Sequence, residues 1–141
     1  MPANGCIYIQ RDEVDLREVF DHVERDKDLG ENASYYDVVL GKDTVRFYVM
    51  PSQEIPNHLQ CFQRYIASLD QDQKRKDDTS YVISHTKVVL GLVTDKEFDE
   101  NPAIWQSLFE IADKYDGLIF TYDSVLLPSG TILVGSLLNN K

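Results

Sequence analysis

The chain has 141 residues, of which 43% are hydrophobic, and it carries a formal net charge of −10. This length fits one domain with its own core, and the composition is that of a globular protein and not of a disordered one. An acidic chain lacks the Lys and Arg excess that binding to a nucleic-acid backbone requires, so we expect no nucleic-acid partner.

The sequence also predicts no membrane partner and a cytoplasmic location. The longest apolar runs are about five residues, too short for a membrane span. The N-terminal residues have neither a basic start nor a long apolar run, so we expect no signal peptide. Two scattered cysteines, Cys6 and Cys61, have no metal-binding spacing and fit a reducing compartment.

The N-terminal part predicts a strand followed by a helix. The apolar run at 6–10 is rich in β-branched and aromatic residues, which favours a strand. Over 15–26, Asp15 and Glu18 form a capping box, and apolar residues recur at helical spacing. That apolar stripe consists of Leu16, Val19, Phe20 and Val23. We therefore expect an amphipathic helix over 15–26.

The next segments predict a hairpin and a second helix. Two apolar runs within 35–50 flank Gly41-Lys42-Asp43, which is typical of a β-hairpin, and Pro51 ends the second strand. The second helix covers 56–69. Its apolar face is formed by Leu59, Phe62, Ile66 and Leu69. Residues 70–80 are polar with nearly balanced charge, so we expect a solvated loop there.

The remaining elements are three strand segments and a third helix. Segment 81–85 is ambiguous, because Ser80 could cap a single helical turn. Segment 87–93 lacks alternation, as expected for a strand buried on both faces, and is the candidate central strand. Segments 118–122 and 125–135 predict a strand and a final turn-and-strand unit.

The third helix, over 101–117, has the clearest boundaries. Asn101 is the expected cap, Pro102 lies in the first turn, and Gly117 ends the helix. Its inward stripe is formed by Ile104, Leu108, Ile111 and Tyr115, with Trp105 and Ala112 beside it. We expect Trp105 to be largely buried against the sheet.

Together these elements predict a single α+β domain over 1–141, with a mixed β-sheet of about six strands and three main helices. The order is β-α-β-β-α-β-α-β-β, whose beginning matches a ferredoxin-like fold. Segments 36–45 and 122–132 share Tyr-Asp-x-Val-Leu, a turn, and Thr with a β-branched residue. A duplicated β-α-β-β unit would explain this sequence similarity, and chance similarity between two hairpins would explain it equally well.

An acidic stretch before the third helix resembles a calcium loop only in part. Asp95, Glu97 and Asp99 alternate as in an EF-hand. An EF-hand loop needs Gly at position 6, where this sequence has Glu100. It also needs a bidentate Glu at position 12, where this sequence has Gln106. We expect a helix start, with acids near the positive end of the helix dipole, and no metal site.

Few residues are candidates for catalysis. His58 and Cys61 are three residues apart in the predicted helix 56–69, so a catalytic Cys–His dyad is geometrically possible. Packing of both side chains in the core is the favoured interpretation, since Cys is often buried. Motifs for phosphate loops, C-x-x-C, H-E-x-x-H and G-x-S-x-G are absent from the sequence. Two-carboxylate chemistry stays open in a chain with 24 acids. We predict no catalytic residue and no cofactor.

The acidic segment gives the one positive indication of function. Residues 12–31 contain nine acidic and three basic residues. On the predicted helix, Glu18, Asp21 and Glu24 lie opposite the apolar stripe. Such a face is usually only solvated; the alternative is a docking surface for a basic protein, whose association the charges would accelerate.

The C-terminal part resembles a segment of uncharacterised bacterial proteins with a domain of unknown function. The shared features are the strand and loop Leu90 to Asp99, the anchor Trp105, Asp116 to Phe120, and the closing hairpin Pro128 to Val134. These residues form core and turns, so the resemblance implies a bacterial cytoplasmic protein of unknown function and carries no catalytic residue.

Three classes of function follow from these observations. The first is a non-catalytic protein-binding module, for example an acidic immunity protein that neutralises a toxin. The second is a small-molecule sensor with a cleft beside the central strand, and the third is an enzyme with an unrecognised site.

Overall fold

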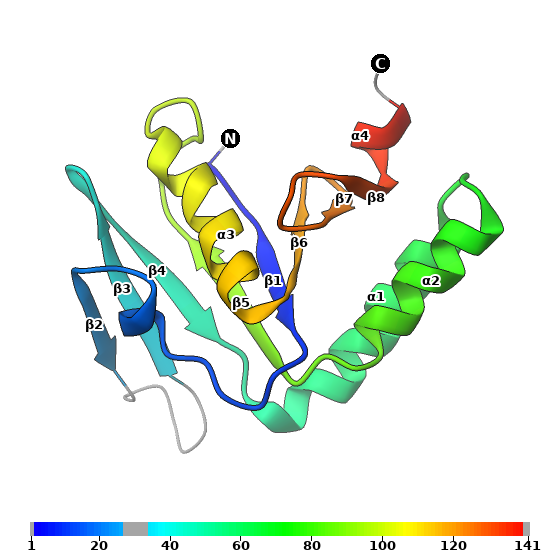
Figure 1. The fold of residues 1–141 in the computed structure, drawn as a ribbon, viewed down its shortest axis with the longest axis horizontal. Helices are drawn as coiled ribbons and strands as arrows, with labels where there is room; N and C mark the ends of the chain where they lie inside the picture. Colours follow the sequence, from blue (N-terminus) through cyan, green and yellow to red (C-terminus); the bar gives the residue numbers. More distant parts are fainter. Residues whose placement is uncertain (1, 27–33, 140–141) are drawn as a thin grey trace.

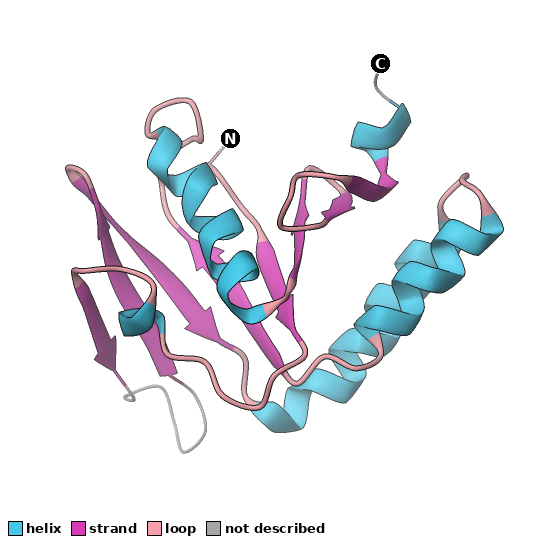
Figure 2. Ribbon diagram, viewed as in Figure 1, coloured by secondary structure: helices cyan, strands magenta, loops and turns pink. Residues whose placement is uncertain are grey.

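The computed structural model describes residues 2–26 and 34–139, which form one sheet with helices on both faces (Figures 1 and 2). The strands are β1 (Cys6–Ile9), β2 (Val23–Asp26), β3 (Ser34–Leu40), β4 (Asp43–Val49), β5 (Val88–Val93), β6 (Leu118–Thr121), β7 (Ser124–Leu126) and β8 (Ile132–Gly135). Their order in the sheet is β2-β3-β4-β5-β1-β6-β7-β8.

Three main helices accompany the sheet. They are α1 (Ile55–Ser68), α2 (Gln73–Ile83) and α3 (Pro102–Tyr115). Short elements are the 3-10 turns η1 (Leu16–Glu18) and η2 (Ser52–Glu54) and the terminal turn α4 (Ser136–Asn139). The α+β class is therefore confirmed. The described sheet has eight strands and not about six, and every pairing in it is antiparallel and not mixed.

The middle of the sheet is formed by β1 and β5, which confirms β5 as a central strand. Ile7 of β1 lies opposite Leu90 of β5 on one side and Ile119 of β6 on the other. All three side chains are fully buried toward α3. The apolar run of β5 lacks alternation because this strand is covered on both faces over most of its length.

Each face of the sheet has its own core. On one face, α3 and the segment around η1 pack on residues from β1 and β3 to β7. On the other face, α1 and α2 pack on residues of β1 and β5 to β8. No described residue of β2, β3 or β4 belongs to this second core. In Figure 1 the pair α1–α2 accordingly runs beside one end of the sheet, away from β2 and β3.

The predicted helix over 15–26 is wrong. Its place is taken by the short turn η1, whose Asp15 cap accepts a hydrogen bond from the backbone N–H of Arg17, and by the edge strand β2. The four stripe residues Leu16, Val19, Phe20 and Val23 do face one core. Leu16 reaches the core from η1, whereas Val23 reaches it in β2, where pairing with β3 satisfies backbone groups that a helix would have bonded internally.

The predicted loop over 70–80 is also wrong, because most of it belongs to α2. Asp72 caps this helix by accepting the N–H of Arg75, and the ion pair Lys74–Asp78 supports its exposed face. Only Thr79 and Ile83 of the helix are buried. So weak an apolar stripe escapes periodicity analysis, and the ambiguous segment 81–85 contains its last turn.

The ferredoxin-like beginning and the duplicated unit are not found. A ferredoxin-like fold needs a helix after its first strand, and the described residues between β1 and β3 contain only η1 and β2. The two similar segments form the hairpins β3–β4 and β7–β8, near opposite ends of the sheet. Their turns also differ, because Leu40 pairs with Asp43 across a tight β3–β4 turn, whereas Leu126 pairs with Ile132 across the longer β7–β8 loop.

The hairpin β3–β4 and helix α3 are confirmed. Gly41 in the hairpin turn has φ +67, which glycine adopts readily. The Asn101 side chain accepts the N–H of Ala103 and donates to the Leu40 carbonyl, so it caps α3 and ties the helix to the hairpin. The helix ends at Asp116 in a left-handed conformation, one residue before the expected glycine. Gly117 is needed instead for its close approach to β1.

Trp105 is less buried than expected. It is half-buried on α3 and meets Phe98 edge to face and Phe109 and Tyr122 at tilted angles, with ring centroids between 5.0 and 6.0 Å apart. The indole therefore anchors an aromatic cluster at the rim of the α3 core.

Candidate functional site

Glu18 lies apart from the other two predicted partner-binding residues. It ends η1, on the α3 side of the sheet, and its carboxylate accepts a hydrogen bond of 2.7 Å from the Tyr115 hydroxyl. Burial raises the pKa of Tyr115 to about 12, and the Glu18 carboxylate contributes to this shift. Glu18 thus fixes η1 to α3, and the expected common face of three acids does not exist.

Asp21 and Glu24 lie together in a groove on the other side. Glu24 of β2 pairs with Asp37 of β3, so their side chains share the sheet face opposite α3. The groove has a volume of about 700 Å³. We call it the acidic groove; it is lined by Asp21, His22, Val23, Glu24, Asp37, Val39 and Thr44. Sequence analysis missed Asp37, because only the pairing of β2 with β3 brings it beside Glu24.

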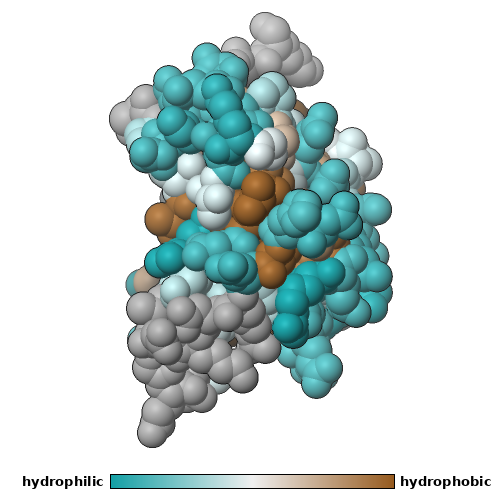
Figure 3. Space-filling model, turned by 90° about the vertical axis from the view of Figure 1, so that its left-hand side faces the viewer, coloured by the Kyte–Doolittle hydropathy of each residue, from teal (hydrophilic) through white to brown (hydrophobic). Residues whose placement is uncertain are grey.

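The acidic groove opens onto an uncovered half of the sheet. Val39 and Val93, on this face of β3 and β5, are 44% and 55% exposed. Arg46 of β4 lies opposite Val93 on one side and Asp37 on the other; it pairs with Asp37 at 2.9 Å and stacks 3.6 Å above the Tyr35 ring. Seen from the β2 end, the surface shows apolar atoms at its centre bordered by hydrophilic residues (Figure 3).

The two edges of the sheet differ. At the β8 edge, the Gln71 side chain accepts the N–H of Gly135 and donates to its carbonyl, both at 2.7 Å, as a neighbouring strand would. Arg75 donates to the carbonyls of Ile132 and Leu133. At the other edge, no strand among the described residues pairs with the outer side of β2. An edge strand of this kind is a template for added β-structure.

His58 and Cys61, for which packing was the favoured interpretation and a catalytic dyad the alternative, do not form a site. Cys61 is exposed, so its expected burial is wrong. His58 turns toward the sheet, where its Nε2 lies 2.8 Å from the Tyr8 hydroxyl. Burial lowers the pKa of His58 and raises the pKa values of Tyr8 and the neighbouring Cys6 thiol. A thiol held protonated by burial is a poor nucleophile, so this cluster acts as packing between β1 and α1.

The acidic loop at 95–100 is organised by its own hydrogen bonds. The Glu100 carboxylate accepts the N–H of Glu97, just before the cap of α3. Within residues 2–26 and 34–139, no group of three or more His, Cys, Asp or Glu side chains has the geometry of a metal site. The absence of calcium binding here stays a prediction.

The fold and groove define an α+β protein with an eight-stranded antiparallel sheet, helices on both faces and one acidic, half-open side. Comparisons with protein-family models, with curated proteins and with solved structures found no match. None of the helices in the described part of the chain has the length and apolar character that crossing a membrane requires.

Proposed function

We propose that the chain is a non-catalytic protein-binding module, and that a basic segment of its partner docks in the acidic groove. The observation that carries this proposal is the convergence of Asp21, Glu24 and Asp37 beside the exposed Val39. A toxin-neutralising immunity protein of the bacterial cytoplasm is one concrete form of such a module.

The charges support a basic partner. Three carboxylates line the acidic groove, and the only Arg or Lys contacting one of them in the described ion pairs is Arg46, at Asp37. Complementary charge mainly raises the rate of association and excludes wrong partners. Exposed charges are screened within about 8 Å at physiological ionic strength, so association should slow as salt is added.

The backbone supports an extended partner segment. The edge strand β2 forms one wall of the groove through Val23 and Glu24, and its outer side pairs with no described strand. A partner strand added there would gain main-chain hydrogen bonds, and its alternate side chains would reach the carboxylates. Glu18 contributes to the negative field but lies outside the groove.

The test uses a fluorescein-labelled peptide of alternating Lys and Val as a probe, measured by fluorescence anisotropy. In the variant Asp21→Asn/Glu24→Gln, we expect binding to weaken by about fivefold or more, since two carboxylates of the groove are neutralised. The control variant Glu110→Gln/Asp113→Asn removes the same charge from the exposed side of α3. It should bind within about twofold of the parent, as its charges lie outside the groove.

An equal loss of peptide affinity in both variants would show that the peptide responds to net charge alone. That result would refute binding in the acidic groove. Thermal melts of both variants establish that neither change alters the fold.

A further inference from the structure

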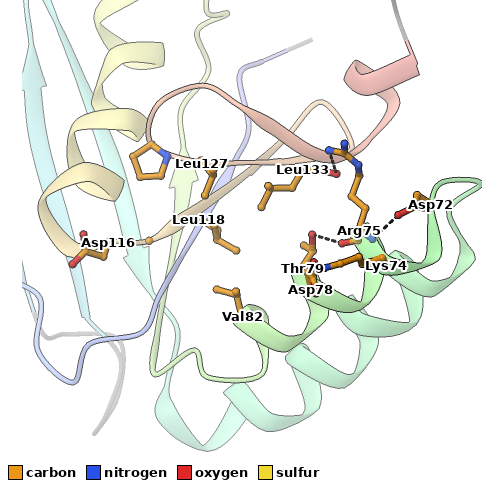
Figure 4. A pocket seen from close by; sticks show the side chains of 12 residues that line it. Asp72, Lys74, Arg75, Asp78, Thr79, Val82, Asp116, Leu118, Leu127 and Leu133 are labelled. Carbon is orange, nitrogen blue, oxygen red and sulfur yellow. Dashed lines mark hydrogen bonds and ion pairs between the residues drawn. The ribbon is translucent and has the colours of Figure 1, made fainter.

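A second cavity lies at the other end of the sheet, between α2 and the strands β6 to β8 (Figure 4). Its volume is about 600 Å³, within the range of about 300–1,000 Å³ typical of small-molecule sites. The cavity is distinct from the acidic groove, since the two share no lining residue.

Apolar side chains from three elements form its walls. Leu118 of β6, Leu127 and Leu133 from the β7–β8 hairpin, and Val82 of α2 point into a common space (Figure 4). Leu118 is buried, whereas Val82 remains 37% exposed across the cavity. Apolar walls that face one another without contact forgo dispersion and hydrophobic stabilisation, which an apolar ligand would restore.

Most charges at the cavity rim already have partners. Lys74 pairs with Asp78 at 2.8 Å, one turn along α2. Asp116, at the end of α3, pairs with Arg11. These side chains therefore contribute no net attraction for a charged ligand.

Arg75 is the exception. Its Nη1 donates to the carbonyls of Ile132 and Leu133, at 3.3 and 3.2 Å, and these acceptors are neutral. Among the ion pairs of the described residues, none joins its guanidinium to a carboxylate. The side chain is exposed at the cavity mouth beside Leu133. A guanidinium presents several donors in a planar fork that matches a carboxylate.

We propose that this cavity binds a small amphipathic monocarboxylate, with its carboxylate on Arg75 and its alkyl or aryl body against Leu118, Leu127, Leu133 and Val82. A dianion such as a phosphate monoester would bring a second negative charge that Arg75 alone does not neutralise, at a rim that also carries the carboxylate of Asp72. The proposal is independent of the acidic groove and of any protein partner.

Octanoate is the probe, titrated into the ¹⁵N-labelled protein and followed by two-dimensional NMR. We expect saturable shifts at Leu118, Leu133 and Val82. Octanol and octylamine, which lack the negative charge, should bind at least about tenfold more weakly, as charge-assisted hydrogen bonds predict. Octyl phosphate should also bind more weakly than octanoate. Equal or tighter binding of octylamine or octyl phosphate would overturn the charge assignment.

Two variants locate the site. Arg75→Gln should weaken octanoate binding by at least about tenfold, while Arg75→Lys retains most of it. Arg64→Gln, at an exposed arginine of α1, makes the same charge change and should leave binding unaltered. Val82→Trp fills the cavity without touching Arg75 and should abolish the shifts. Octanoate binding that survives both Arg75→Gln and Val82→Trp, or that never saturates, would refute the proposal. If the Arg75→Gln variant does not fold because β8 is loosened, the Val82→Trp variant and the comparison of octanoate with octanol, octylamine and octyl phosphate test the proposal.

Discussion

Gly135, at the end of β8, is the described glycine at which an added methyl group should be least tolerated. Its φ is +116, a backbone conformation that residues with a side chain rarely adopt. A Cβ placed there would lie 2.3 Å from Ser124 Cα and 2.4 Å from the Asp123 carbonyl oxygen. Both neighbours are backbone atoms, and Gln71 holds Gly135 on its other side, so the strand has no room to move away.

The cost of Gly135→Ala has two parts. Holding a non-glycine residue in a sparsely populated backbone region costs about 1–3 kcal/mol. Overpacking against atoms that cannot move costs about 1–3 kcal/mol more. We therefore expect the free energy of unfolding to fall by about 2–6 kcal/mol. In urea, where the slope for small proteins is about 1–3 kcal/mol per molar, the unfolding midpoint should drop by roughly 1–2 M or more.

Two other glycines separate these contributions. Gly41 has φ +67, and no atom lies within 4 Å of the position that a Cβ would take, so Gly41→Ala should cost only the backbone part, about 1 kcal/mol. Gly91 has neither a positive φ nor a close neighbour, so Gly91→Ala should be neutral or slightly stabilising. Urea titration of the three variants gives the ranking. A Gly135→Ala protein as stable as Gly41→Ala would refute the steric argument.

Four further outcomes are expected. Cys61 is exposed and Cys6 has a pKa raised by burial, so a maleimide should label Cys61 first; preferential labelling of Cys6 would contradict the structure. Burial lowers the pKa of His58, so the folded state binds fewer protons than the unfolded one. Stability should therefore decrease as the pH falls from about 7 to 5, through the usual range of His, and a His58→Asn variant should lose part of this dependence in urea titrations. Trp105→Ala should cost roughly 1–3 kcal/mol, less than a fully buried Trp, since the indole is half-buried; an unchanged urea midpoint would rule out its anchoring role. Isothermal titration should detect no micromolar calcium binding at Asp95–Glu100, because the loop lacks the glycine and the final carboxylate of an EF-hand.

Elements with strong local signals were predictable from the sequence. Helix α3 has a capping Asn101, a Pro in its first turn and a regular apolar stripe, and all of these determine structure over a few residues. The hairpin β3–β4 follows from Gly41 between two apolar runs. The central place of β5 follows from an apolar run without alternation, which needs cover on both faces.

The wrong prediction of a helix over 15–26 has a different cause, because the structure of that segment depends on a strand outside it. Helical spacing is shared by Leu16, Val19, Phe20 and Val23, yet Val23 lies in β2 and pairs with Val38 of β3. No local sequence pattern shows that this strand pairing is favoured over a helix. For the same reason the candidate site was only half predictable. Asp21 and Glu24 stand out by charge, whereas Asp37 joins them only when β2 pairs with β3.

The position of β1 has a consequence for how the chain folds. Its Ile7 pairs with Leu90 and Ile119, so β1 is synthesised well before either of its two partner strands. The hairpin β3–β4 can close at once, but the centre of the sheet must wait for β5 and β6. The pairings β1–β5, β1–β6 and β4–β5 join strands that are distant in the sequence, and distant pairings of this kind raise the contact order and slow folding. Until β5 and β6 are synthesised, the apolar β1 lacks its neighbours in the sheet, and unpaired strands of this kind make a folding chain prone to aggregate.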